Sequence, residues 1–406
     1  MNVKSIKQQL YKCDDMLKLY QYFLKFYKMR TMERKRSLFV LISFLILFIS
    51  LKSYQIVPQG AFLGIDLQSN YAFHHCKKVL EDNISIYAAT GLECNDYNGR
   101  RYGHPPAMYK LFVWMRIFDE FKTTYYVWII IYIFSFIYVF WIIFRKISSK
   151  NYFVLFSIFL FFQFPSIFAM ERGNNDILIV LLWTLGLKTY YEKHYFAFGG
   201  VASAACFLKL YPIFSIMTII IGEILYISRY SWVKFTSIIK GFIITSILLF
   251  SFQIKLWISY ITETLPYFIT TTRPLNLFSH SLKSLPLPGF LILIMYIVIL
   301  LLFSLVYIKH SKNNISLALS GCLAISTLYG GVSYDYNLIT IYPFIITLFM
   351  YVQNKLNFIN CLIFYLLLLS FIGDPDFFNW GYKGILFRAY LQPLSLIFCS
   401  IMLLKD

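Results

Sequence analysis

The sequence predicts an all-α, polytopic membrane protein with about twelve helical spans. Of its 406 residues, 59% are apolar and 20% aromatic, and only 14% are charged. That composition is far more apolar than a soluble domain of this length requires. Long apolar runs recur along the chain and alternate with short clusters of basic residues. Such runs match the roughly 20 residues that a helix needs to cross a bilayer, so most of the chain is expected in lipid.

Twelve runs are long enough, or nearly long enough, to cross a membrane. They lie at residues 37–52, 125–144, 152–169, 176–191, 195–209, 212–228, 238–254, 289–308, 315–330, 338–352, 358–372 and 386–403. Several hold nearer ~15 residues than ~20, so we expect neighbouring polar segments to enter the membrane as well. The first run follows a basic tail and ends without a small-residue cleavage site, which predicts a signal anchor.

The basic residues set the predicted orientation. The formal net charge of +18 does not indicate nucleic-acid binding, because Lys and Arg concentrate in the tail and in short loops, as in the cytoplasmic loops of membrane proteins. The tail over residues 1–36 holds ten of them and is expected to be cytoplasmic and to contact anionic lipid. We therefore predict that residues 37–403 form a single multi-pass domain in a bacterial inner membrane, with both termini cytoplasmic.

The first outward-facing loop, residues 53–124, is unusually long. Connections in compact domains usually span about 4–6 residues, so a loop of this size is expected to be functional. Its stretch 104–118 is apolar but contains Lys110 and Arg116 and opens with two prolines. This pattern predicts an amphipathic helix lying in the membrane interface rather than a further crossing.

The distinctive polar residues lie in the outward-facing loops, which places the predicted site at the periplasmic face. Asp66 is in the first of these loops, and an Arg-Gly-Asn-Asn-Asp turn over residues 172–176 opens the fourth span. A Lys-Leu-Tyr-Pro turn over residues 209–212 joins the fifth and sixth spans. Weaker signals are an Asn-x-x-Ser-His segment over residues 276–280 and a Tyr-Asp-Tyr turn over residues 334–336.

Together these segments resemble glycosyltransferase family 87, the polyprenyl-phosphate-sugar-dependent mannosyltransferase type of the GT-C superfamily. The resemblance runs from about Leu38 to Met350 and preserves the order and spacing of the segments. It implies a GT-C type bundle with interfacial helices in the first outer loop. It also implies an inverting enzyme that moves a hexose or pentose from a polyprenyl-phosphate sugar to a glycan or glycolipid acceptor. Asp66 would be the catalytic base, and the lipid-linked sugar would be a substrate, with no cofactor.

The two turns supply candidate groups for the donor phosphate. Spans that run inward begin at the outer face, so their N-termini present free N–H groups and positive dipole ends there. Arg172 and Lys209 add full positive charge, and Asn174 and Tyr211 stand beside them in the sequence. An alternative for Arg172 is an i,i+4 ion pair with Asp176 on one helix, and for Lys209 a side chain that snorkels to the interface.

Further polar residues are candidates for contacts with the sugar or the acceptor. They are Glu171, Asp176, His104, Asn276, His280, Asp335 and Tyr336. Solvation in a loop is an open alternative for His104, Asn276, His280, Asp335 and Tyr336. A retaining mechanism would require a second carboxylate near the first, and the sequence leaves Glu171, Asp176 and Asp335 open for that role; inversion is what the resemblance implies.

Metal-ligand spacing is not evident in the sequence, since the six histidines are scattered and His74 and His75 are adjacent. Cys76 and Cys94 both lie in the first outer loop, where thiols tend to be oxidised. A disulfide between them would restrict the unfolded loop by roughly 3 kcal/mol. The alternative is that Cys76 packs as a small apolar residue and Cys94 stays free.

Two other functions remain open from the sequence. An O-antigen polymerase or ligase would also carry outer loops, and a lipid-linked glycan flippase or transporter would carry ionisable residues within its spans. Glu223 is the carboxylate placed well inside a predicted span, without an obvious basic partner, and no internal repeat is apparent. The identities of the sugar and of the acceptor cannot be read from the sequence.

Overall fold

The computed structural model describes residues 32–48, 64–81, 85–95, 102–144, 151–226, 229–266, 282, 287–329, 335–370 and 381–405. Within these ranges the regular structure is helical and contains no strand. The helices occupy the places where the apolar runs predict them. They are the helix over residues 32–48, α5 (Phe121–Phe144), α8 (Asp176–Tyr191), α9 (Tyr195–Leu208), α10 (Ile213–Leu225), α11 (Arg229–Ser251), α14 (Gly289–His310), α15 (Ile315–Tyr329), α16 (Tyr342–Asn354), α17 (Phe358–Leu369) and α18 (Gly381–Lys405).

The lengths of these helices support a membrane-embedded protein. Three helical segments are long and apolar enough to cross a bilayer unaided: Phe121–Ile143, Trp232–Ser251 and Gly289–His310. The other apolar helical segments of the described chain span 10–17 residues, such as Tyr195–Leu208 and Tyr390–Lys405. The all-helical class of the described chain is therefore confirmed and is consistent with a membrane protein, whereas the number of twelve crossings stays a prediction.

One predicted span differs from the structure. The run over residues 152–169 is divided into α6 (Asn151–Phe161) and α7 (Phe164–Arg172). Gln163 between them has an extended backbone, and Pro165 lies in the first turn of α7. Proline has no N–H to donate, so it fits the first turn of a new helix better than the interior of a continuous one. The predicted span over residues 338–352 also differs from one continuous α-helix. Its first residues belong to the 3₁₀ helix η4 (Asp335–Ile341), and α16 follows.

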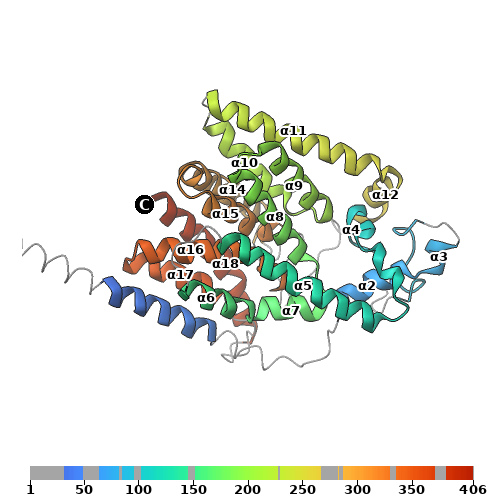
Figure 1. Ribbon diagram of the computed structural model, residues 1–406, viewed down its shortest axis with the longest axis horizontal. Helices are drawn as coiled ribbons and strands as arrows, with labels where there is room; N and C mark the ends of the chain where they lie inside the picture. The colour runs from blue at the N-terminus through green and yellow to red at the C-terminus, as the bar shows by residue number, and fades with distance from the viewer. Residues whose placement is uncertain are drawn as a thin grey trace, which may run out of the picture.

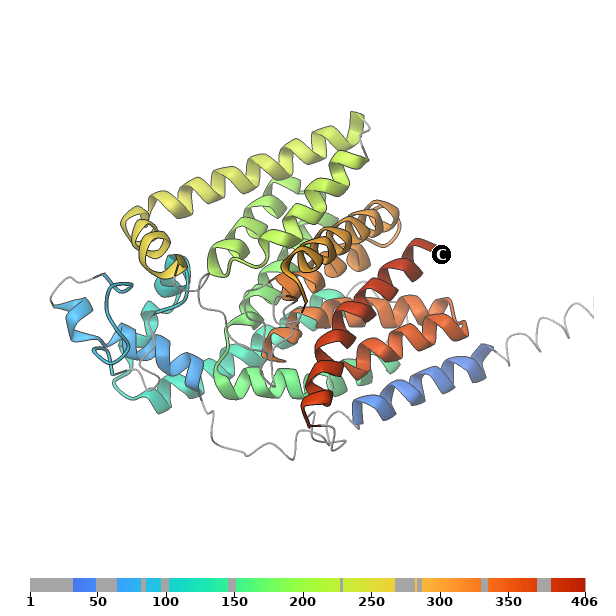
Figure 2. The same ribbon diagram turned by 180° about the vertical axis from the view of Figure 1, so that it is seen from behind.

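The centre of the bundle is α15. Nearly all of its side chains are buried, and it packs against α10, α14, α16 and η4. In Figure 2, α14 and α15 lie between α10 on one side and α18 on the other. By contrast, α11 exposes many apolar side chains and packs closely against α9. This pattern fits a bundle with a dry core and an apolar outer surface in contact with lipid.

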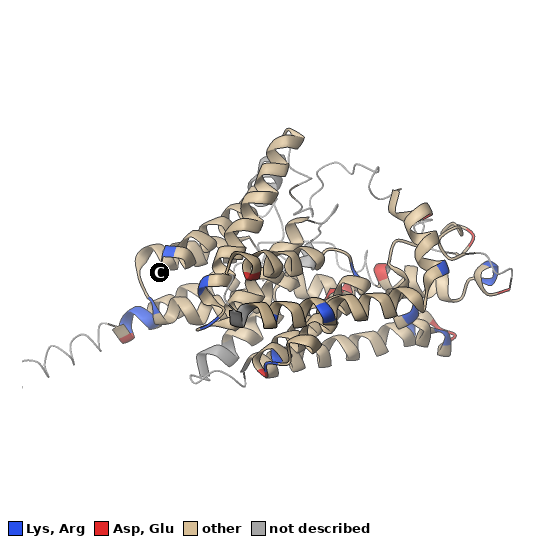
Figure 3. Ribbon diagram, turned by 90° about the horizontal axis from the view of Figure 1, so that it is seen from above, with Lys and Arg blue, Asp and Glu red and all other residues tan. Residues whose placement is uncertain are grey.

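The bundle has two different ends (Figure 1). At one end lie α2 (Ile65–His74), α3 (Lys77–Leu80), α4 (Pro106–Leu111) and α12 (Ile254–Ser259); the C-terminus and the junction between α16 and α17 lie at the other. Charged residues are most frequent toward the two ends, and a few lie between them (Figure 3). This arrangement agrees with the predicted separation of an outer loop face from the face that carries the C-terminus.

The first outer loop builds a small apolar core of its own. Phe73, Tyr87, Tyr102 and Tyr109 pack there against Trp257 and Tyr260, which follow α11. We call this unit the lobe, made of residues 64–81, 85–95, 102–118 and 254–265 of the described chain. The expected helix over 104–118 is two short elements, α4 and the 3₁₀ helix η1 (Val113–Ile117). Pro105 and Pro106 start α4, as predicted, and neither element is long enough to cross a bilayer.

Candidate active site where the lobe meets the bundle

Asp66 and Arg172 form the first half of the candidate site. Asp66 is in the first turn of α2, and Arg172 is the last residue of α7. The guanidinium holds both carboxylate oxygens, with Nη2 at 2.7 Å from Oδ1 and Nε at 3.0 Å from Oδ2. Asn174 Nδ2 donates to the same Oδ2 at 3.3 Å. A two-point pairing of this kind fixes the orientation of the carboxylate as well as its charge.

Asp176 anchors the second half. It begins α8 and is completely buried. Its Oδ1 accepts hydrogen bonds from Lys209 Nζ at 2.6 Å and from Tyr211 Oη at 2.7 Å. Asn174 joins the halves, because its Oδ1 accepts from the Asp176 backbone N–H at 2.9 Å while its Nδ2 contacts Asp66. We call these six residues the charged network: Asp66, Arg172, Asn174, Asp176, Lys209 and Tyr211.

Two glycines explain why α2 can dock on this turn. Gly173 caps α7 in the left-handed conformation, with φ of 69°, and a Cβ there would come within 2.5 Å of Leu67 Cβ. Gly64 precedes α2 with φ of 67°, and its N–H donates to the Glu171 carbonyl at 2.5 Å. Residues with a side chain rarely adopt this conformation. The two turns therefore bring Asp66 to Arg172 across 106 positions of sequence.

His104 lies close to the charged network. Its pKa is lowered to about 4, mainly by burial and also by the Lys209 charge, while the Asp66 charge acts in the opposite direction. The imidazole is therefore neutral at neutral pH. Its ring meets Tyr102 edge to face at 5.6 Å, and Tyr102 Oη donates to Asn70 Oδ1 at 2.8 Å. Asn70 Nδ2 donates in turn to the Asp66 carbonyl at 3.0 Å, so these side chains link His104 to the helix that carries Asp66.

The structure describes only some of the other residues that were predicted to contact the sugar or the acceptor. Glu171 is half-buried beside Arg172, and its carbonyl accepts from Tyr125 Oη at 3.1 Å. The backbone of η4, which includes Asp335 and Tyr336, packs against α7; the side chains of these two residues lie outside the described part. Asn276 and His280 also lie outside the described residues.

The structure contradicts the alternative explanations for Arg172 and Lys209. Arg172 ends α7 and Asp176 begins α8, with the left-handed Gly173 turn between them, so the two do not share one helix face. Lys209 does not merely extend toward the interface, because its ammonium contacts the buried Asp176. Sequence reasoning placed these residues at one end of the bundle but missed their pairing, since neither Asp66 with Arg172 nor Asp176 with Lys209 is a local pair.

The two carboxylates differ in accessibility. The Asp66 side chain is 19% exposed and its Arg172 partner 13%, whereas that of Asp176 is 0% exposed and that of Lys209 13%. A molecule arriving from solvent can therefore reach the Asp66 carboxylate but not that of Asp176.

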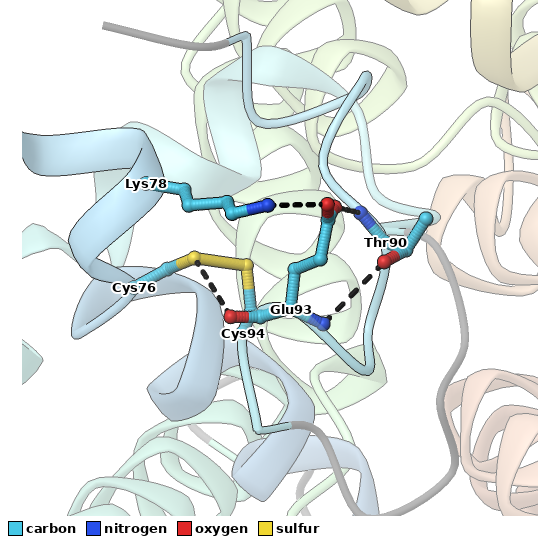
Figure 4. A network of polar contacts seen from close by, with 5 residues as sticks. All are labelled: Cys76, Lys78, Thr90, Glu93 and Cys94. Carbon is cyan, nitrogen blue, oxygen red and sulfur yellow. Dashed lines mark hydrogen bonds and ion pairs between the residues drawn. A yellow bond between two sulfur atoms is a disulfide. The ribbon is translucent and has the colours of Figure 1, made fainter. Parts of the chain in front are cut away.

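A disulfide closes part of the lobe. Cys76 and Cys94 are joined, with their Cα atoms 4.7 Å apart. Beside them, Lys78 Nζ lies 2.6 Å from Glu93 Oε1, and Glu93 Oε2 accepts from the Thr90 N–H at 2.8 Å (Figure 4). The Lys78 contact and the Thr90 N–H lower the pKa of Glu93 to about 2. The bridge fixes the segment that follows α2, the helix that carries Asp66.

Glu223 has a basic partner that the sequence did not reveal. Its Oε1 accepts from Lys234 Nζ and from Tyr307 Oη, and Lys234 also contacts Tyr190 Oη at 3.0 Å. Glu223 lies near the end of α10 and Lys234 near the start of α11. The pair therefore bridges a helix hairpin, at the end of α10 away from the charged network.

Other features of the described chain add no reacting group. An apolar hollow of about 420 Å³ lies between α5 and α6, and Ser157 is the polar side chain in its lining. Within the described residues, no group of three or more His, Cys, Asp or Glu is arranged to hold a metal ion. No protein-family model, curated protein or solved structure matches the chain, so the chemistry of the site is argued from its geometry.

Proposed function

We propose that the protein is a glycosyltransferase that inverts the anomeric centre of its donor sugar. The donor would be a hexose or pentose on polyprenyl phosphate, and the acceptor a glycan or glycolipid at the periplasmic face of a bacterial inner membrane. One observation carries the proposal: a reachable carboxylate, Asp66, is aligned by Arg172 beside a second cation, Lys209, at one end of an apolar bundle. A lipid-linked sugar phosphate presents its anion and its sugar at that level, with its chain in the bilayer.

Asp66 is suited to act as the base. The acceptor hydroxyl must lose its proton as its oxygen bonds to the anomeric carbon, and a positioned carboxylate can accept it. The contacts from Arg172 and Asn174 fix the direction of the carboxylate oxygens.

The charge balance of the network suggests how the leaving phosphate is stabilised. The charged network contains two carboxylates and two cations, so its net charge is zero. When Asp66 takes the acceptor proton, its attraction for Arg172 weakens, and the network gains one positive charge. At the same moment the bond from the anomeric carbon to the phosphate oxygen breaks, and the phosphate leaves with the electron pair. Positive charge would thus develop where negative charge appears.

The proposal assigns inversion rather than retention, as the family resemblance implies. A double displacement needs a second carboxylate that can attack the anomeric carbon. Asp176 is buried, and its Oδ1 is engaged by Lys209 and Tyr211, so it is unsuited to attack. Its role in the proposal is to hold Lys209 in place.

A lipid-linked glycan flippase is the second candidate. The observation in its favour is the buried pair of Glu223 and Lys234, because transporters keep ionisable groups within the membrane. A flippase would move its substrate between leaflets without breaking a glycosidic bond, so product analysis separates the two functions.

The test uses proteoliposomes that contain a labelled polyprenyl-phosphate sugar and a lipid-linked acceptor. We expect the wild-type protein and a Glu81→Gln control, which alters an exposed lobe carboxylate, to release polyprenyl phosphate and to form one product. The anomeric configuration of this product, measured by NMR, should be opposite to that of the donor. A product of retained configuration would refute the mechanism, and movement of intact donor between leaflets without cleavage would favour the flippase.

A further inference from the structure

A second polar site lies on the lobe, apart from the charged network. A hollow of about 490 Å³ opens between α3, α4 and α12. Lys110, Arg116 and Lys255 line it, and none of the described residues in its lining is acidic. The first two come from the first outer loop and the third from the start of α12, so the hollow forms only when these segments pack together. Three positive charges around one hollow favour an anionic ligand.

The wall of the hollow is partly preorganised. Arg116 Nη2 donates to Tyr109 Oη at 2.7 Å, and the Tyr109 ring stacks on His74 at 4.3 Å. On the opposite side, Ser85 Oγ lies 2.6 Å from Ser259 Oγ. Ser259 in turn donates to Glu263 Oε1 at 2.5 Å.

Exposed apolar side chains flank the basic ones on the same elements. Leu111, Val113 and Ile117 are 45%, 44% and 75% exposed beside Lys110 and Arg116. Ile254 and Ile258 are 49% and 54% exposed on either side of Lys255. Alternation of basic and apolar exposed residues is typical of segments that lie in the headgroup region of a membrane. A free anion in solution would not require this apolar rim.

The hollow is close to the candidate active site but separate from it. Asp66 is in the first turn of α2 and His74 in the last. At 1.5 Å per residue, eight residues of helix span about 12 Å. Because His74 stacks on Tyr109, which lines the hollow, the far end of α2 marks one wall of the second site.

We propose that this hollow binds the anionic phosphate headgroup of a membrane-anchored lipid. Lys110, Arg116 and Lys255 contact the phosphate, while the apolar rim meets the lipid chains. Binding requires no glycosyl transfer, so it can be tested even if the proposed reaction is wrong. Both a bilayer phospholipid and a lipid-linked acceptor carry a phosphate headgroup on a lipid chain, and the experiment below distinguishes them.

The experiment is native mass spectrometry of the purified full chain titrated with phosphatidylglycerol, or with phosphatidylcholine, whose phosphate is balanced by an ammonium. The variant Lys110→Gln/Lys255→Gln is compared with Lys122→Gln/Lys193→Gln, which removes two exposed charges outside the elements that form the hollow. Each basic residue near an anionic surface contributes a factor of about five, so the first variant should bind phosphatidylglycerol roughly 25-fold more weakly. Wild-type protein and the control should keep the preference for phosphatidylglycerol.

Equal binding by both variants would overturn the proposal, and so would an equal preference of wild-type protein for the two lipids. Farnesyl diphosphate is then added to the wild-type complex. Displacement of phosphatidylglycerol assigns the site to phosphate-bearing carrier lipids such as an acceptor; resistance to displacement assigns it to bilayer phospholipid.

Discussion

The ion pair between Asp66 and Arg172 should be strongly coupled, and a double-mutant cycle measures that coupling. The changes are Asp66→Asn, Arg172→Gln and the two together. Both side chains are mostly buried. Two unit charges ~4 Å apart attract by ~4 kcal/mol at an effective dielectric constant near 20, and desolvation of the pair offsets much of this attraction. We therefore expect a coupling free energy of about 1–3 kcal/mol.

The single variants should be the more damaging ones. Asp66→Asn leaves the Arg172 charge without its partner in a poorly hydrated site, whereas the double variant removes both charges. The free energy of unfolding can be measured in mixed micelles with increasing SDS. Reaction of the buried thiols Cys206 and Cys322 with a fluorescent reagent then reports opening of α9 and α15.

The exposed pair of Lys78 and Glu93 provides the matched control cycle, because its side chains are 45% and 37% exposed and surface pairs couple weakly. The reasoning fails if the buried pair couples no more strongly than this surface pair. In that case the packing of Leu67 against Gly173, rather than the charges, would hold α2 on the turn.

Three further predictions concern the lobe and the topology. The loop disulfide should leave both of its cysteines unalkylated until the protein is reduced, and Cys76→Ser should lower the free energy of unfolding by roughly 3 kcal/mol; alkylation before reduction would exclude the bridge. A reporter fused after Asn313 should read cytoplasmic and one after Gly373 periplasmic, and inverted signals would require residues 104–118 to cross the membrane. Burial lowers the pKa of His74 to about 3 and that of His104 to about 4, from an ordinary 6.5. Since the unfolded chain then binds more protons, stability should fall as the pH drops from 6.5 toward 4, and a melting temperature that rises over this range would contradict the two shifts.

Hydropathy was sufficient to predict where the helices lie. The run over residues 176–191 coincides with α8, because a continuous apolar segment between polar turns has few other ways to satisfy its backbone in lipid. Pro165 divides another run into two helices, and hydropathy did not detect the break because both halves are apolar. The number of crossings depends on how the shorter helices sit in a bilayer, and helix length alone does not determine it.

The sequence predicted which residues form the candidate site but not which of them pair with one another. The turns around Arg172 and Lys209 were identified because charged residues are rare beside long apolar runs. Their partners were missed because sequence reasoning favours local pairs, whereas Asp66 lies 106 positions before Arg172 and Asp176 lies 33 before Lys209. Glu223 seemed isolated for the same reason, since Lys234 reaches it only through the α10–α11 hairpin. The positive φ at Gly173, which makes the docking of α2 possible, could not be read from hydropathy.

The measurement that tests the central claim most directly is the initial rate of sugar transfer by Asp66→Asn in proteoliposomes. The rate is taken relative to wild-type protein and to the Glu81→Gln control, with each normalised to the folded fraction. General acid–base catalysis contributes about 10²–10⁴-fold, so the account predicts a loss of that size for Asp66→Asn and none for the control. Transfer by folded Asp66→Asn protein within about tenfold of the wild-type rate would show that another group takes the acceptor proton, and would contradict the account.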